Sequence, residues 1–275
     1  MTGGVYHLII AGIGIRLALP GPLPEELEPF RGTDGAESVS YELEIISCPL
    51  SPQGNPAHQG VRQTVYRVEG GWLRLFSGQT AGLRLTPDGR NTLYLHRDDV
   101  CRYQRPYSII GLLGAEYPLL WHGRIILHSS LVLHRGRVIL FSGPSGVGKS
   151  TQAALWQQYA GAQVLNGDRA VIDCAGGIAH GSPFSGSSGI RIQAAAPIRA
   201  IVFLEQGEQN LIAPVSPLEA YRRLYSQVIA NPWDSDYTEK LCNLIEILIR
   251  QNPMYRFTCR PDGTAVAALM DCLKD

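Results

Sequence analysis

One segment near the middle of the chain has the residue types and spacing of a phosphate-binding loop. It runs Gly143, Pro144, Ser145, Gly146, Val147, Gly148, Lys149, Ser150, and Thr151 follows it. Glycine, four residues and then Gly-Lys-Ser is the P-loop pattern, in which backbone amides and a helix N-terminus hold anionic phosphates. In such a loop Lys149 reaches the β- and γ-phosphates, and the Ser150 hydroxyl holds Mg²⁺. We therefore expect residues 143–151 to bind Mg²⁺ and a nucleoside triphosphate, with ATP as our prediction.

The residues on either side of this loop predict the strand and the helix that the motif needs. Residues 137–142 form a β-rich apolar run that enters the loop, and residues 150–160 have a helical pattern that leaves it. Gly161 is available as the C-terminal cap of that helix. Strand, loop and helix in this order indicate a nucleotide-binding architecture.

A hairpin before the loop brings a histidine toward the phosphates. Arg135-Gly136 lies between two β-rich runs and predicts a two-residue hairpin turn, in which His134 pairs with Arg137. Continued along the ladder, this register places His128 opposite Gly143. His128 could then contact a γ-phosphate or support a catalytic base, although a buried histidine bonded to a backbone carbonyl is the ordinary alternative.

Phosphoryl transfer also needs a carboxylate for the metal and cations near the transferring oxygens. Asp168 follows the first apolar strand after the P-loop helix, so it is the first choice, although a carboxylate there can also be a simple turn residue. Glu205 is the rival, because it follows the strand predicted at residues 198–204. Arg169 and Arg191 are candidate cations and equally fit the description of surface arginines. The Gly/Ser-rich residues 182–189 fit either a lid or peptide-docking loop or a passive linker.

The first 105 residues have the pattern of a β-rich region, and we place a domain boundary at Pro106. A strand is expected at residues 8–15, another at 38–46, and hairpins turn at Gly70-Gly71 and around Pro87-Asp88-Gly89. Closely spaced turns and period-two patterning favour an antiparallel sheet here. Residues 106–275 then form a P-loop domain, with a buried helix at residues 108–121 and three helices after the strand at 198–204.

Composition and charge exclude several classes of protein. Lys and Arg together equal Asp and Glu at 24 each, so no bulk positive field is available for nucleic acid or for an anionic membrane. The apolar residues 8–15 have no basic flank and are too short to span a bilayer, so we expect neither a signal peptide nor a membrane segment. The six cysteines form no Cys-x-x-Cys motif, which together with the P-loop favours a reducing cytoplasm.

Three segments together resemble the catalytic domain of the HPr kinase/phosphorylase family. They are the residues Leu-His-Ser-Ser at 127–130, the P-loop at 143–150 and Leu-Asn-Gly-Asp-Arg at 165–169. The resemblance is stronger to short bacterial relatives, some of which phosphorylate serine in lasso-peptide precursors, and it covers residues 123–204. It implies an α/β fold class, in the form of an α+β domain with a mixed sheet. The implied P-loop domain is of the type found in HPr kinase and phosphoenolpyruvate carboxykinase.

The resemblance also implies an activity and the residues that perform it. The chain is expected to be an ATP- and Mg²⁺-dependent kinase that phosphorylates a hydroxyl, most simply serine, on a peptide, protein or small molecule. His128 matches the family histidine, and Asp168-Arg169 match the last two residues of its Asp-Asp-Arg triplet. Gly167 replaces the first aspartate, which is the family's proton-transfer group, and Thr151 replaces a common glutamate. A P-loop ATPase or a nucleotide-sensing protein is therefore the alternative. Family members assemble, which is compatible with a homo-oligomer.

Overall fold

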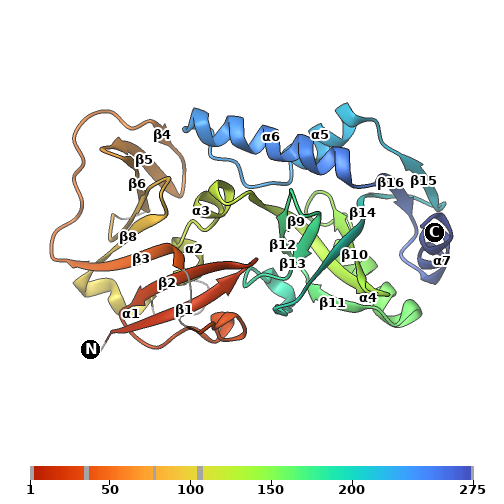
Figure 1. Ribbon diagram of the computed structural model, residues 1–275, viewed down its shortest axis with the longest axis horizontal. Coiled ribbons are helices and arrows are strands. Elements are labelled where there is room, and N and C mark those ends of the chain that lie inside the picture. The colour runs from red at the N-terminus through yellow and green to blue at the C-terminus, as the bar shows by residue number, and fades with distance from the viewer. Residues whose placement is uncertain (1–2, 34–36, 77–78, 104–107, 274–275) are drawn as a thin grey trace. The chain divides into compact units, whose positions relative to one another are not determined.

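The computed structural model describes residues 3–33, 37–76, 79–103 and 108–273. Its contacts divide the chain, drawn as a ribbon in Figure 1, into two compact units. The first comprises Met1–His122 and Asn231–Tyr237, and the second comprises Gly123–Ala230 and Thr238–Asp275. The domain boundary expected at Pro106 lies within residues 104–107, outside the described ranges.

The first unit is built on an eight-stranded sheet with the order β1-β2-β3-β8-β7-β6-β5-β4. Its described elements are β1 (Gly4–Ile10), β2 (Ile13–Leu19), the 3-10 helix η1 (Glu25–Phe30), β3 (Glu37–Ile46), β4 (His58–Gln59), β5 (Gln63–Val68), β6 (Gly71–Phe76), β7 (Ala81–Leu85), β8 (Arg90–His96), η2 (Arg97–Asp99), α1 (Val100–Tyr103), α2 (Ser108–Leu112) and α3 (Glu116–Trp121). The expectation of an antiparallel sheet is wrong at its centre, because β3 pairs in parallel with both β2 and β8. Long connections, rather than tight turns, bring these strands together.

Two turns in this unit differ from the sequence prediction. Residues 8–15 are not one strand but the facing ends of β1 and β2, which turn at Ala11-Gly12 with φ angles of 51° and 76°. The residues around this turn are apolar, so the sequence pattern does not indicate a turn there. Gly12 permits the turn because glycine adopts positive φ without steric cost. The β5–β6 hairpin turns at Glu69-Gly70, one residue before the predicted position, since Val68 pairs with Gly71.

The prediction of a single helix at residues 108–121 is also wrong, because the structure has two short helices there. Gly114 lies between α2 and α3 with φ at 51°, a left-handed conformation that ends the first helix. The turn around Pro87-Asp88-Gly89, between β7 and β8, is where it was expected.

The second unit carries a second mixed sheet, in which the strand pairings close into a ring. The ring runs β10–β9–β12–β13–β14 and returns to β10, with β16 and β15 continuing from β14 and β11 pairing with β9. Its elements are β9 (Arg124–His134), β10 (Arg137–Ser142), α4 (Lys149–Ala160), β11 (Gln163–Asn166), β12 (Arg169–Asp173), β13 (Ile178–His180), η3 (Gly186–Ser188), β14 (Ala195–Gln206), β15 (Leu211–Pro214), α5 (Pro217–Tyr225), α6 (Ser235–Gln251), β16 (Met254–Cys259) and α7 (Gly263–Cys272). Two mixed sheets with helices confirm the expected α+β class; β13, β15 and β16 were not predicted.

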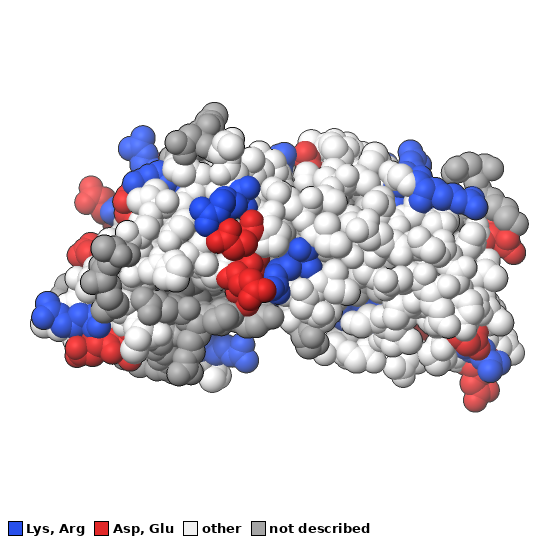
Figure 2. Space-filling model, turned by 90° about the horizontal axis from the view of Figure 1, so that it is seen from below, with Lys and Arg blue, Asp and Glu red and all other residues white. Residues whose placement is uncertain are grey.

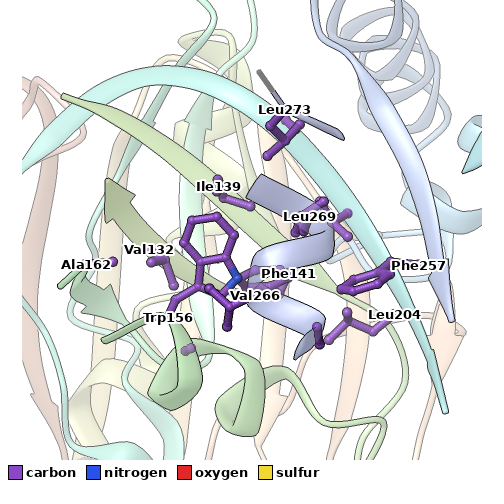
Figure 3. Close-up of a cluster of buried hydrophobic side chains, with 14 of the residues drawn as sticks. Val132, Ile139, Phe141, Trp156, Ala162, Leu204, Phe257, Val266, Leu269 and Leu273 are labelled. Atoms are coloured by element: carbon purple, nitrogen blue, oxygen red, sulfur yellow. The ribbon is translucent and has the colours of Figure 1, made fainter. Parts of the chain in front are cut away.

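Helices α4 and α7 pack together over one face of the second sheet. The core beneath them contains Trp156 of α4, Phe141 of β10, Leu204 of β14 and Leu269 of α7, all almost fully buried (Figure 3). The Trp156 ring lies 6.2 Å from that of Phe141 between centroids. This packing holds α4 against β10, which are the two elements that the loop at residues 143–148 connects.

The surface shows no extended patch of one charge on the face drawn in Figure 2. Basic and acidic side chains lie near one another there rather than in separate fields. Among the described residues, no helix has the length and apolar character needed to cross a membrane.

Candidate functional site

The loop between β10 and α4 has a backbone that only glycine adopts readily. Gly143, Gly146 and Gly148 have φ angles of 147°, 80° and 112°. A Cβ atom built on Gly146 or Gly148 would have no neighbouring atom within 4 Å, so the loop faces open space. Gly148 precedes α4 without a side-chain cap from the described residues. The first amides of the helix are therefore available to an anion.

Lys149 bends back over this loop. Its Nζ donates hydrogen bonds to the carbonyl oxygens of Gly143 at 2.8 Å and Pro144 at 2.9 Å. The residue is 7% exposed. Burial lowers the pKa of Lys149, and the Asp168 carboxylate acts in the opposite direction. The loop thus holds its cation at the point where the motif places phosphates.

The hairpin between β9 and β10 has the register predicted from the sequence. His134 pairs with Arg137, and the ladder ends at the pair of Ser129 and Ser142. His128 therefore comes directly after the last pair, beside the first residue of the loop. The Ser142 hydroxyl also donates to the His128 carbonyl oxygen at 3.0 Å. This hairpin brings His128 to the end of the sheet where the loop at residues 143–148 begins.

Asp168 lies against His128 at the same end. His128 Nε2 is 3.4 Å from Asp168 Oδ1, and Arg169 Nε is 3.4 Å from Asp168 Oδ2. The hydrogen bond from His128, and then the charges of Arg169, His128 and Lys149, hold the pKa of Asp168 below its usual value although burial opposes them. The carboxylate is thus ionised and about 30% exposed, as a metal ligand must be.

A hydrogen-bonded turn fixes the direction of Asp168. The buried Asn166 accepts through Oδ1 from the backbone amides of Asp168 and Arg169, each at 2.8 Å. Its Nδ2 donates to the Ser182 carbonyl oxygen at 2.9 Å, and the Ser130 hydroxyl donates to the Gly167 carbonyl oxygen at 3.1 Å. Sequence reasoning named Asn166 only within the resemblance, although an asparagine before Gly-Asp is an ordinary turn signal.

The 3-10 helix η3 lies over this turn. A Cβ atom built on Gly167 would be only 2.2 Å from Ser188 Oγ. A Cβ atom on Gly186 would similarly be 2.7 Å from Asp168 Cγ. The segment that the sequence left open between a lid and a linker therefore contacts the site in this structure. No pattern in its glycines and serines distinguished Ser188 beforehand.

These elements enclose a polar pocket of about 290 Å³. Its lining residues come from the loop, the start of α4, the end of β9, the Asp168 turn and η3; they are His128, Ser145, Gly146, Gly148, Lys149, Ser150, Thr151, Gly167, Asp168 and Ser188. A second cavity of about 350 Å³ shares Gly146, Gly148 and Thr151 with it. Val147 lines that second cavity.

Of the predicted charged residues, Glu205, Arg191 and Arg169 do not line the polar pocket. Glu205 Oε1 accepts from Arg223 at 2.5 Å, and its Oε2 accepts from the Thr258 hydroxyl at 3.2 Å. Arg191 Nη1 lies 3.4 Å from both Ser185 Oγ and the Gly189 carbonyl oxygen. The side chains of Glu205 and Arg191 therefore make structural contacts, and Asp168 is the carboxylate that reaches the P-loop.

The pocket's donor set fits a magnesium ion bound together with phosphates. Among the residues that the structure describes, no three His, Cys, Asp or Glu side chains meet as a metal site. Mg²⁺ seldom uses such a cage, because it keeps several waters and takes one or two carboxylates with substrate phosphates. The Asp168 carboxylate and the Ser150 hydroxyl in one pocket supply that kind of partial ligand set.

No protein-family model matches the chain, and no curated protein shows a significant match to its sequence.

Proposed function

We propose that this chain is an ATP-dependent kinase that transfers the γ-phosphoryl group to a hydroxyl, most simply that of serine. The observation that carries the proposal is one pocket lined by Lys149, Ser150, Asp168 and His128. A P-loop alone suits any nucleotide-binding protein. The ionised carboxylate beside a histidine, facing the same space, adds the groups that phosphoryl transfer uses.

We further propose that the second unit has the fold type of HPr kinase and phosphoenolpyruvate carboxykinase. Two features support this. The P-loop strand β10 lies between the antiparallel β9 and the parallel β14, so its sheet is mixed rather than wholly parallel. Each of the three segments that carry the resemblance, at 127–130, 143–150 and 165–169, also contributes residues to the lining of one pocket.

Each residue has a defined part in the proposed mechanism. The loop amides and Lys149 bind the phosphates, while Asp168 and Ser150 would hold Mg²⁺, which neutralises charge on the phosphate oxygens. Asp168 accepts the proton of the attacking hydroxyl, and His128 orients its carboxylate. The low pKa of Asp168 makes it a weak base, which suffices because a loose transition state develops little charge on the nucleophile.

The resemblance, the surface charge and the cysteines support proposals for the acceptor, the assembly and the location of the protein. The proposed acceptor is a peptide, protein or small molecule with a free hydroxyl, and the proposed assembly is a homo-oligomer. The balanced charge supports neither nucleic acid nor membrane as a partner. The six cysteines are all free, which supports a reducing cytoplasm as the location.

One observation favours a second function. Gly167 offers no side-chain proton acceptor, and Ser188 lies against it. A P-loop ATPase or a nucleotide-sensing protein needs no acceptor site. Glycine at position 167, where the family has an aspartate, is therefore compatible with either of these functions. Loss of the base need not abolish transfer, however, because general-base catalysis contributes only roughly 10²–10⁴-fold.

Mass spectrometry of a panel of serine-containing peptides and small alcohols, incubated with the protein and Mg-ATP, tests the proposal. A phosphorylated acceptor that is absent with the Asp168→Asn variant is the expected result. Complete conversion of ATP to ADP and free phosphate, with no phosphorylated acceptor and none of the phosphate on the protein, would favour the ATPase. ATP binding without turnover would favour the sensor.

A further inference from the structure

The chain places one of its own hydroxyls in the pocket. Among the side chains that the structure describes, four that bear a hydroxyl line it, and three of them (Ser145, Ser150 and Thr151) belong to the phosphate-binding segment itself. Ser188 is the fourth and comes from η3, a separate part of the chain. The residue is exposed.

Gly167 provides the space that this hydroxyl occupies. Any side chain at position 167 would place its Cβ 2.2 Å from Ser188 Oγ, which is far inside van der Waals contact. The two residues are thus mutually dependent in this conformation. An aspartate at position 167 would require Ser188 to move away. Gly167 therefore has two effects: the site lacks the carboxylate that the family has at this position, and Ser188 has room beside the Asp168 turn.

Local hydrogen bonds fix the position of Ser188. Its Oγ donates to the Ser185 carbonyl oxygen at 2.7 Å and accepts from the Ile190 amide at 3.3 Å. Gly186 and Gly189, with φ angles of 53° and 68°, turn the chain before and after it. The segment is anchored to the Asp168 turn as well, because the Ser182 hydroxyl donates to the Arg169 carbonyl oxygen at 2.5 Å. The hydroxyl is therefore held beside the proposed catalytic groups by the fold itself.

We propose that Ser188 is a phosphoryl acceptor, so that the chain phosphorylates itself; this inference rests on the proposed kinase function. Ser188 Oγ attacks the γ-phosphorus of ATP and a new O–P bond forms. The bond from the γ-phosphorus to the β,γ-bridging oxygen breaks, and ADP leaves with that electron pair. The hydroxyl proton passes to the Asp168 carboxylate and then to water.

The surroundings suit the product as well as the reaction. A phosphoserine carries a charge of about −1.5 to −2 and three strong acceptor oxygens. Arg191 already contacts this segment through Ser185 Oγ and the Gly189 carbonyl oxygen, and Arg169 lies beside Asp168. The Arg191 guanidinium, which is already at this segment, can pair with the new phosphate, and such pairs order a loop. Phosphorylation would then fix η3 over the pocket and hinder external acceptors.

The test is phosphopeptide mapping of the purified full-length protein after incubation with Mg-ATP. We expect phosphate on Ser188, with a rate constant that does not change when the protein is diluted, as an intramolecular reaction requires. Ser188→Ala should abolish the modification, Ser188→Thr should retain it, and Ser226→Ala, which removes an exposed serine outside the pocket, should leave it unchanged. Phosphate on any other residue with Ser188 unmodified would overturn the inference.

The outcome also separates this inference from the proposed function. Phosphorylation of an added acceptor with Ser188 unmodified would overturn the inference and leave the kinase proposal standing. If ATP binds but neither an acceptor nor Ser188 gains phosphate, both fail. A readout independent of turnover is ATP affinity: Ser188→Glu, which places negative charge in the pocket, should weaken ATP binding at least about tenfold, while Ser226→Glu should not.

Discussion

His128 Nε2 lies 3.4 Å from Asp168 Oδ1 at the mouth of the P-loop, where two separate turns bring them together. The Arg135-Gly136 hairpin sets the position of His128, and the Asn166 side chain sets that of Asp168. The Ser129 amide, which donates to the Asp168 carbonyl oxygen at 2.9 Å, joins the two elements. The geometry of this pair leads to several predictions.

Removing the imidazole should slow transfer without preventing nucleotide binding. His128→Ala removes the imidazole that bonds to the Asp168 carboxylate, so the carboxylate loses one of the groups that orient it, while the loop and Lys149 remain. We expect kcat for phosphoryl transfer to fall about 10²-fold, the lower end of a general-base contribution. His134→Ala, on the same strand but distant from the pocket, is the control. Wild-type kcat in His128→Ala would rule out its role.

Neutralising Asp168 should have a larger effect, because one residue serves both metal and proton transfer in our account. Asp168→Asn should reduce transfer by roughly 10²–10⁴-fold or more and weaken Mg²⁺-dependent ATP binding. Asp173→Asn is the matched control, since Asp173 ends the same strand β12 and pairs with Arg124 at 3.0 Å. Calorimetric titration of ATP with and without Mg²⁺ checks both effects. Full turnover in Asp168→Asn would shift the metal site to Glu205.

The lowered pKa of Asp168 also predicts a pH dependence of stability. A carboxylate whose pKa is lower in the folded state stabilises the fold fully above its unfolded pKa of about 3.9, and this contribution is lost as pH falls through the folded pKa. The difference in unfolding free energy between wild type and Asp168→Asn should therefore be constant above about pH 5 and change progressively below about pH 4. Denaturant titrations at a series of pH values, from above about pH 5 to below about pH 4, measure this difference. A difference that does not vary with pH would show that the pKa is not lowered.

Two substitutions at Gly167 distinguish two effects of the glycine. One effect is the space that it leaves for Ser188, and the other is the absence of a carboxylate at this position. Gly167→Ala and Gly167→Asp both place a Cβ against Ser188 Oγ, so both should abolish phosphorylation of Ser188. Only Gly167→Asp supplies a proton acceptor, and it should raise transfer to an added acceptor by up to roughly 10²-fold. Phosphopeptide mapping and acceptor assays on the same samples check this. Equal acceptor activity in the two variants would contradict a catalytic role for a carboxylate at this position.

The core under α4 should control the stability of the second unit. Trp156 is 1% exposed and packs against Phe141 and the His134 ring. Trp156→Ala should lower the free energy of unfolding by about 3–5 kcal/mol, as truncations of large buried aromatics do. Tyr159→Ala removes a 58% exposed ring from the same helix and should cost far less. Equal losses in the two variants would mean that Trp156 does not anchor α4.

The site could be predicted where its signals are local in sequence. At the turn Arg135-Gly136 both residues have positive φ angles, 48° and 74°. The glycine in the sequence indicates such a two-residue turn, and the turn then sets the register of β9 against β10. The helix after the P-loop begins at Lys149 and ends before Gly161, within one residue of the predicted bounds. These elements needed no information from distant parts of the chain.

The features that escaped prediction depend on contacts between distant segments. The short strands β15 and β16 form because β16 pairs in parallel with β14, a partner about fifty residues earlier in the chain. Ser188 reaches the pocket because Ser182 bonds to the Asn166 and Arg169 turn. Nothing in a run of glycines and serines indicates such anchoring. Glu205 resembles Asp168 in its sequence context, but in the structure it bonds to Arg223 of α5 and Thr258 of β16.

The most direct test of the account is calorimetric titration of Mg-ATP into the wild-type protein and into Lys149→Ala. Lys149 is the only charged side chain of the loop, and its loss should leave the core under α4 intact. We predict that the wild type binds ATP and that Lys149→Ala binds it at least about tenfold more weakly, a loss of about 1.4 kcal/mol or more. Lys240→Ala, on α6, should bind as the wild type does. Equal affinity of wild type and Lys149→Ala, or no binding by either, would contradict the proposed function.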